Sequence, residues 1–148
     1  MSLAAMAVVV IAILAAGFWM RRQRIRRELD AHAITADELQ ALRDSGQEVL
    51  LYDVRQPLDL LAHAEIIPGA TRIAPKDLLA HPDVIPREKE VVVYCTCPSE
   101  KTSREITRRA AELSLLRVKF LRGGLSAWKE KGLPVEPYTN TFRLDTAM

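Results

Sequence analysis

The chain has 148 residues, of which 49% are hydrophobic and 27% are charged. This composition is typical of a folded domain and excludes disordered, collagen-like and low-complexity chains. The length corresponds to one domain, or to one domain with a short appendage. Two cysteines, Cys95 and Cys97, are too few and too close together to staple a small secreted scaffold.

The net charge of +2 conceals an uneven distribution. Residues 1–20 have no charged side chain, and five arginines follow within residues 21–27. Residues 28–148 therefore hold the remaining 16 basic residues and all 19 acidic residues. A slightly acidic body argues against a nucleic-acid-binding protein.

Residues 3–20, LAAMAVVVIAILAAGFWM, form an uncharged apolar stretch that predicts a membrane anchor. As a helix with a rise of ~1.5 Å per residue, this stretch spans roughly 27 Å, close to the ~30 Å of a bilayer core. A signal peptide would have its positive charge before the apolar stretch and a cleavage site after it, whereas the arginines of this chain follow the stretch. A buried core helix rarely runs this long without a polar position. These two alternatives stay open.

The arginines also predict the orientation of the anchor, because positive charge beside a span stays on the cytoplasmic side. We therefore expect a single-pass protein of the cell (inner) membrane, with its N-terminus outside and the body in the cytoplasm. The expected segments are an anchor at 1–20, a basic juxtamembrane linker at 21–33, a folded domain at 34–137 and a tail at 138–148. The basic residues of the linker are Arg21, Arg22, Arg24, Arg26 and Arg27.

The first half of the folded domain contains one clear strand and three helix signals. Thr35 and Glu38 form a capping box that starts a helix. The apolar residues 49–52 predict a buried strand closed by Asp53. Residues 58–61 predict a short helical piece, and Pro75 begins another helix because proline suits the first helical position.

The second half has the strongest strand signal, Val91–Tyr94, which is continuously apolar as in a central parallel strand. Thr102 and Glu105 predict a second capping box at the start of the next helix. Residues 118–121 predict a strand, and residues 125–131 predict a last helix. Because strands alternate with helices, the fold class is α/β, with a mainly parallel central sheet flanked by helices.

Cys95 is the candidate for chemistry, because it leaves the strongest strand just before a helix. Ligands of parallel α/β sheets bind beyond the carboxyl ends of the strands. A thiol there faces backbone N–H groups and the positive end of a helix dipole, which favour the thiolate. Such a site suits a nucleophilic cysteine acting on a small anionic substrate. The alternative is a small, buried and inert strand-end residue.

Four motifs in order resemble those of a rhodanese domain, and the resemblance covers roughly residues 34–137. They are Asp53-Val54-Arg55, Ile67-Pro68-Gly69-Ala70, Val92-Val93-Tyr94-Cys95 and Gly123-Gly124-Leu125-Ser126-Ala127-Trp128. The stretch Cys95–Glu100 is most similar to rhodanese domains attached to bacterial membrane proteins, including those fused behind DedA-type segments. The resemblance implies a rhodanese-like domain at 34–137.

The resemblance implies a sulfurtransferase that needs neither a cofactor nor a metal. A cysteine thiolate takes a sulfane sulfur from thiosulfate or another donor, becomes a persulfide, and passes the sulfur to a thiol or cyanide. The implied partners are a small anionic sulfur donor or a persulfidated protein, a thiol acceptor, and the membrane through residues 3–20. No nucleic-acid partner is expected.

The resemblance also assigns the site residues. Cys95 is the nucleophile, with Cys97 as the alternative, because the loop from Cys95 to Ser103 is about two residues longer than usual. Asp53 and Arg55 hold the strand end, and Gly123 and Gly124 allow close backbone approach beside the loop. The substrate-binding loop comprises Thr96, Cys97, Pro98, Ser99, Glu100, Lys101, Thr102, Ser103 and Arg104.

Two other functions fit the same sequence. One is a non-catalytic rhodanese-fold module that docks a partner at the membrane, although inactive members often lose the cysteine. The other is phosphatase or arsenate chemistry in the same loop, which the negative charge of Glu100 disfavours. Glu100 and Lys101 are expected to be exposed charges that act on the thiolate in opposite directions.

Overall fold

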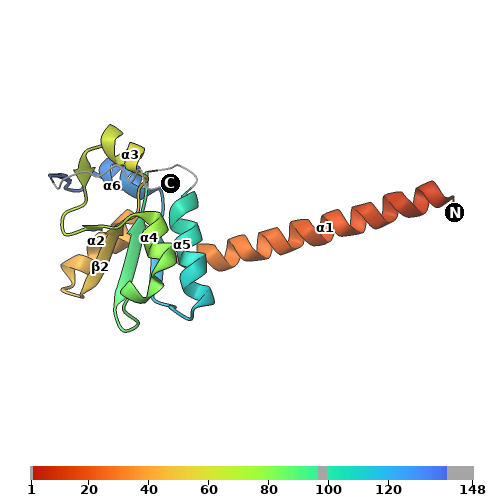
Figure 1. Cartoon of the computed structure of the whole chain (residues 1–148), viewed down its shortest axis with the longest axis horizontal. Helices are drawn as coiled ribbons and strands as arrows, with labels where there is room; N and C mark the ends of the chain where they lie inside the picture. The colour runs from red at the N-terminus through yellow and green to blue at the C-terminus, as the bar shows by residue number, and fades with distance from the viewer. Residues whose placement is uncertain (1, 97–99, 140–148) are drawn as a thin grey trace. The chain divides into compact units, whose positions relative to one another are not determined.

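The computed structural model describes residues 2–96 and 100–139 (Figure 1). The chain divides into two compact units between Ala31 and His32. The first unit is a single helix and the second is an α/β domain.

The first unit is the helix α1, Leu3–Asp30, which has 28 residues and no buried residue. The Ser2 side chain accepts a hydrogen bond from the Ala5 backbone N–H at 3.4 Å and so caps its first turn. The helix does not end with the apolar stretch but continues through the five arginines. In the part of the chain that the structure describes, α1 alone is long and apolar enough to span a membrane. A signal sequence near an N-terminus can have the same length and composition.

The second unit is built on a five-stranded sheet with the order β1-β6-β5-β2-β4, in which every pair of neighbours is parallel. This arrangement confirms the predicted fold class. The central strand β5 is flanked by β2 and β6, and its residues Val91–Val93 are almost completely buried. The strands are β1 (Ala33–Ile34), β2 (Val49–Asp53), β4 (Thr71–Arg72), β5 (Glu90–Tyr94) and β6 (Val118–Leu121). A separate antiparallel pair joins β3 (Glu65–Ile66) to β7 (Glu136–Pro137).

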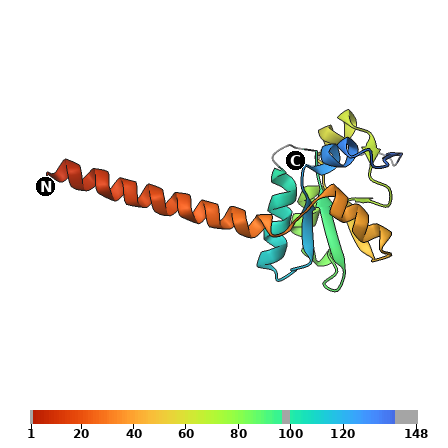
Figure 2. The ribbon, with the colours of Figure 1, turned by 180° about the vertical axis from the view of Figure 1, so that it is seen from behind.

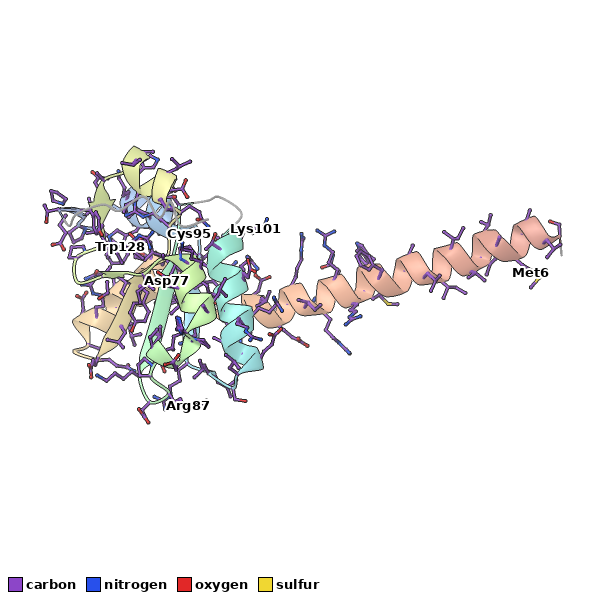
Figure 3. All side chains as sticks on the ribbon, viewed as in Figure 1. Met6, Asp77, Arg87, Cys95, Lys101 and Trp128 are labelled. Atoms are coloured by element: carbon purple, nitrogen blue, oxygen red, sulfur yellow. The ribbon has the colours of Figure 1, made fainter. Side chains whose placement is uncertain are left out.

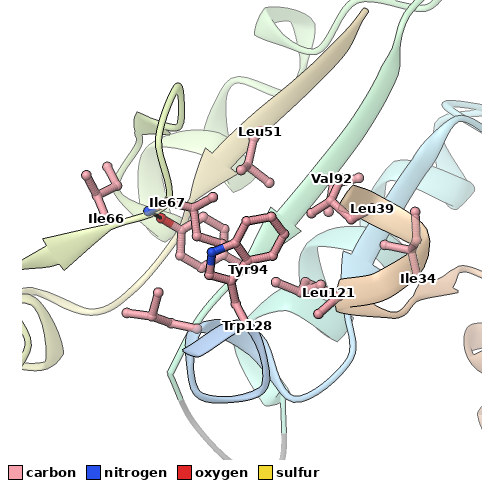
Figure 4. Packing of buried hydrophobic residues seen from close by; sticks show 11 residues of the cluster. Ile34, Leu39, Leu51, Ile66, Ile67, Val92, Tyr94, Leu121 and Trp128 are labelled. Carbon is pink, nitrogen blue, oxygen red and sulfur yellow. Dashed lines mark hydrogen bonds between the residues drawn. The ribbon is translucent and has the colours of Figure 1, made fainter. Parts of the chain in front are cut away.

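Helices cover both faces of the sheet. On one face, α4 (Pro75–Ala80) and α5 (Lys101–Glu112) pack over a core that includes Val91 and Phe120. On the other face, α2 (Ala36–Asp44) and α6 (Gly124–Glu130) pack over Leu51, Tyr94 and Trp128. Figures 1 and 2 show these two helical layers from opposite sides, and Figure 4 shows the packing around Trp128. The chain also forms α3 (Pro57–Ala62) and a 3₁₀ turn at Pro82–Val84.

Most predicted elements are confirmed, but the start of α5 is not where the sequence predicts it. The capping box of Thr35 and Glu38 is formed at α2, and proline opens both α3 and α4. By contrast, α5 begins at Lys101, so Thr102 lies inside the helix and the capping box predicted with Glu105 is wrong. Glu100 occupies the N-cap position and makes no side-chain cap.

Candidate active site

Cys95 directly follows β5, in the middle of the sheet, and is 2% exposed. Figure 3 places Cys95 and Lys101 at one end of the domain, with Arg87 at the opposite end. The end that holds Cys95 is therefore the carboxyl edge of the parallel strands, where α/β sheets bind their ligands.

The turn between β6 and α6 packs directly on the main chain of Cys95. Leu125 N–H donates to the Cys95 carbonyl oxygen at 3.0 Å. A β-carbon at Gly124, which has φ +56°, would lie 1.9 Å from that same oxygen. Only glycine both adopts this left-handed backbone conformation readily and leaves room for the Cys95 carbonyl oxygen. Gly124 therefore makes a close approach to the site, and Gly123 opens the turn at φ 72°.

The segment between β5 and α5 comprises six residues, Cys95–Glu100. The expectation of a longer loop ending near Ser103 is therefore wrong, because the helix starts at Lys101. Ser103 and Arg104 belong to the first turns of α5. Cys97, Pro98 and Ser99 lie outside the described residues.

Glu100 is not an exposed charge, contrary to the expectation from the sequence. Its side chain is 8% exposed and forms an ion pair with Arg104 at 3.0 Å. The other carboxylate oxygen accepts a hydrogen bond from Gly123 N–H at 2.5 Å. The Arg104 guanidinium in turn lies 4.7 Å from the centre of the Phe120 ring. Lys101 is exposed, as expected.

Two hydroxyl groups of the predicted loop are buried without a hydrogen-bond partner among the described residues. They are Thr96 Oγ1 and Ser103 Oγ. Ser103 is completely buried in the first turn of α5, and Thr96 is half-buried directly after Cys95. Buried hydroxyls are nearly always paired in proteins, and within the described part of the chain these two are exceptions.

The buried pair of Asp53 and Arg55 joins three parts of the chain near the strand ends. Arg55 Nε donates to both Asp53 carboxylate oxygens at 2.9 Å. The Arg55 guanidinium also donates to the carbonyl oxygens of His63 and Glu65, each at 2.7 Å. These bonds tie the end of β2 to His63, at the end of α3, and to the first residue of β3.

Tyr94 extends this network to the residue before Cys95. Its hydroxyl donates to Asp53 Oδ2 at 3.2 Å and accepts from Ile67 N–H at 3.2 Å, as Figure 4 shows for Ile67. Burial, together with the Asp53 carboxylate, raises the pKa of Tyr94 far above its usual value. From the sequence, Tyr94 is predicted only to be a strand residue. Its local pattern gives no sign that its hydroxyl bonds to Asp53, 41 positions away.

A groove of about 320 Å³ opens at the same edge of the sheet. Its walls come from the segments that follow β2, β4 and β5, and it contains two prolines and one charge of each sign. The lining residues are Gln56, Pro57, Ala74, Pro75, Lys76, Leu79, Thr102 and Glu105. Within the described ranges, no three His, Cys, Asp or Glu side chains are placed to hold a metal ion.

Comparison with known proteins gives consistent matches. A sulfurtransferase from Allochromatium vinosum is 31% identical over 108 residues, which cover 73% of this chain and 92% of the relative. A solved structure from Lactobacillus plantarum has a TM-score of 0.65 at 20% identity, covering 79% of this chain and 97% of that protein. Thiosulfate sulfurtransferase from Pseudomonas aeruginosa has a TM-score of 0.61 at 22% identity, covering 73% of this chain and 20% of that protein.

The family model of the rhodanese-like domain matches residues 35–131. The match includes β2, β5 and the Gly123–Leu125 turn, which are the elements that surround Cys95. It leaves out α1. Residues 35–131 make up most of the α/β domain, and the chain therefore belongs to the rhodanese-like domain family.

Proposed function

We propose that the chain is a membrane-tethered sulfurtransferase in which Cys95 carries the sulfur. The single observation that carries this proposal is the position of Cys95, buried directly after the central strand in a domain of the rhodanese-like family. A relative with 31% identity is itself a sulfurtransferase.

The proposed reaction has two steps and needs no external oxidant. The Cys95 thiolate attacks the outer sulfur of thiosulfate, the S–S bond of thiosulfate breaks, and sulfite leaves with the bonding electron pair. The product is a Cys95 persulfide. An acceptor thiolate or cyanide then attacks the outer persulfide sulfur, and the Cys95 thiolate is the leaving group.

Three features of the site support this chemistry. The first N–H groups of α5 have no partner within the helix and so attract an anion. The hydroxyls of Thr96 and Ser103, which have no partner among the described residues, are further donors beside the loop. Arg104 balances the charge of the buried Glu100 carboxylate, and the positive charge of Lys101 is exposed at the first position of the helix.

The decisive experiment compares Cys95→Ser with Cys97→Ser in the full chain. After treatment with thiosulfate, mass spectrometry should show the gain of one sulfur atom on the wild-type protein and on Cys97→Ser. We expect Cys95→Ser to gain no sulfur, because it lacks the nucleophile, and to transfer none to cyanide.

Three other outcomes contradict parts of the proposal. Retained activity in Cys95→Ser with loss in Cys97→Ser reverses the assignment of the nucleophile. Absence of sulfur on the wild-type chain with every sulfane donor favours a docking module. Hydrolysis of p-nitrophenyl phosphate without persulfide formation favours phosphatase chemistry.

The tether is proposed from α1. Its apolar part is exposed throughout, with Phe18 at 69% and Trp19 at 62% exposure, and the arginines begin at Arg21. Lipid would cover such a surface, and the arginines favour a cytoplasmic position for the domain. A reporter fused after Met148 should therefore be active only in the cytoplasm. Activity of a periplasmic reporter at that position contradicts this orientation.

A further inference from the structure

Glu100 is a buried carboxylate at the end of the segment that Cys95 begins. Oε1 accepts a hydrogen bond from Gly123 N–H at 2.5 Å. Oε2 accepts from Nε and Nη2 of Arg104, each at 3.0 Å. Both oxygens are therefore used, as a buried charge requires.

The backbone of Glu100 is in an unusual conformation. Its φ of 53° lies in the left-handed region, which residues with a β-carbon seldom adopt. Among the described residues other than glycine, Ser114 alone shares a positive φ, and it follows the end of α5, where that conformation is common. Such a conformation persists only where surrounding contacts hold it, and among the described residues the Glu100 side chain bonds to Gly123 and Arg104.

One turn connects both ends of the Cys95–Glu100 segment. Leu125 N–H donates to the Cys95 carbonyl oxygen, and Gly123 N–H donates to the Glu100 carboxylate. The bond at Cys95 uses only main-chain atoms, whereas the bond at Glu100 depends on a side chain. Replacing Glu100 therefore removes the side-chain bond to Gly123 and leaves the main-chain bond at Cys95 in place.

The charge of Glu100 is balanced by its partner. Arg104 is 28% exposed and stacks over Phe120, so the carboxylate faces a guanidinium that is itself held in place. A balanced, buried pair exerts little net repulsion on a thiolate. For the thiolate, the geometry of the Glu100–Arg104 pair therefore matters more than its charge.

We propose that Glu100 is a positioning residue for sulfur transfer at Cys95, a role that rests on the proposed function. Through Gly123 and Arg104, its carboxylate fixes the first turn of α5 relative to Cys95. The first N–H groups of a helix, which have no partner within the helix itself, stabilise an anion only when they are correctly placed. Glu100 thus acts on the thiolate and the persulfide through the helix, without touching the substrate.

The test uses the full chain in detergent micelles, with the variants Glu100→Gln and Glu100→Ala. The matched control is Glu112→Gln, which weakens the exposed ion pairs with Arg108 and Arg109 farther along the same helix. The first measurement is kcat and KM for sulfur transfer from thiosulfate to cyanide. The second is the rate of alkylation by iodoacetamide against pH in a Cys97→Ser background, where Cys95 is the only thiol.

A positioning role and a repulsive role predict opposite signs. If Glu100 positions the helix, its loss raises the midpoint of the alkylation profile and lowers kcat by about tenfold, within the range for a misplaced catalytic group. Glu100→Gln should lose less than Glu100→Ala, because the amide oxygen can still accept from Gly123. Glu112→Gln should match the wild type. A lower midpoint with a higher kcat, or no change in either, overturns the proposal.

Failure of the proposed function can be told apart from failure of this inference. If the wild-type chain transfers no sulfur, the alkylation profile still decides whether Glu100 positions the thiol. If Glu100→Ala does not fold, Glu100→Gln keeps the size of the side chain and decides the result. Exchange of the Gly123 amide hydrogen should be faster in Glu100→Ala than in Glu100→Gln, which reports the loss of the bond directly.

Discussion

Gly124 shapes the candidate site because it has no side chain. The Cys95 carbonyl oxygen occupies the space in which a β-carbon would lie, 1.9 Å away. Any larger residue must move either the turn or the main chain of the proposed nucleophile. The structure and the activity of the site are therefore coupled at a single position.

We expect Gly124→Ala to destabilise the domain by about 1–3 kcal/mol, from backbone strain and from the displaced main chain. It should also lower sulfur transfer more than its loss of stability explains. Gly46→Ala is the matched control, because Gly46 has φ +78° but no neighbouring atom within 4 Å of the point where a β-carbon would lie. Urea unfolding and transfer rates measure both effects. Equal losses in the two variants would show that strain alone matters.

At the scale of elements, α2 has the most complete local stabilisation. The Thr35 hydroxyl accepts from Glu38 N–H at 3.2 Å, and the Glu38 carboxylate accepts from Thr35 N–H at 2.8 Å. These bonds to Thr35 lower the pKa of Glu38 below its ordinary value of 4.5. The start of this helix is thus stabilised by the charged form of Glu38.

We expect Thr35→Ala to cost about 1 kcal/mol of stability at neutral pH, as for other N-cap replacements. Because the pKa of Glu38 is lowered by folding, its contribution is present above the ordinary pKa and is lost as the pH falls through the lowered value. The difference in stability between the wild type and Glu38→Gln should therefore shrink in acid. Thermal unfolding as a function of pH checks this, and a constant difference would contradict it.

The contrast between α2 and α5 shows what the sequence can predict. At α2, the cap residues lie three positions apart, so a local pattern is sufficient. At α5, the same pattern exists at Thr102 and Glu105, but the helix starts at Lys101, directly after Glu100, whose carboxylate bonds to Gly123, 23 positions away. The strands β1 and β4 have two residues each and no pattern of their own. The position of Cys95 was predictable because it depends on the strong β5 signal, whereas the surroundings of Glu100 depend on tertiary contacts.

At the scale of the whole molecule, the chain combines two units with different requirements. The α/β domain buries its own two apolar clusters, one on each face of the sheet. The helix α1 has no buried residue and carries a continuous apolar surface. All residues of these two clusters lie within residues 33–138, so we expect the domain to fold by itself.

We expect removal of residues 1–31 to yield a soluble, folded domain that retains sulfur transfer with thiosulfate. The full chain should instead stay in the membrane fraction after alkaline carbonate extraction, because residues 3–20 hold it there by hydrophobic burial. Fractionation and activity measurements on both proteins test this. Recovery of the truncated protein only in membranes or inclusion bodies would contradict a separable anchor.

The two tryptophans of the chain provide separate optical reporters for the two units. Trp128 is completely buried, and its indole N–H donates to the Pro134 carbonyl oxygen at 2.8 Å. Its fluorescence emission should shift to the red when the domain unfolds. Trp19 lies on the exposed surface of α1, so its emission should shift to the blue on contact with lipid vesicles. Replacing either tryptophan with phenylalanine would isolate the other signal, so folding and membrane insertion can be followed independently in two single-tryptophan variants.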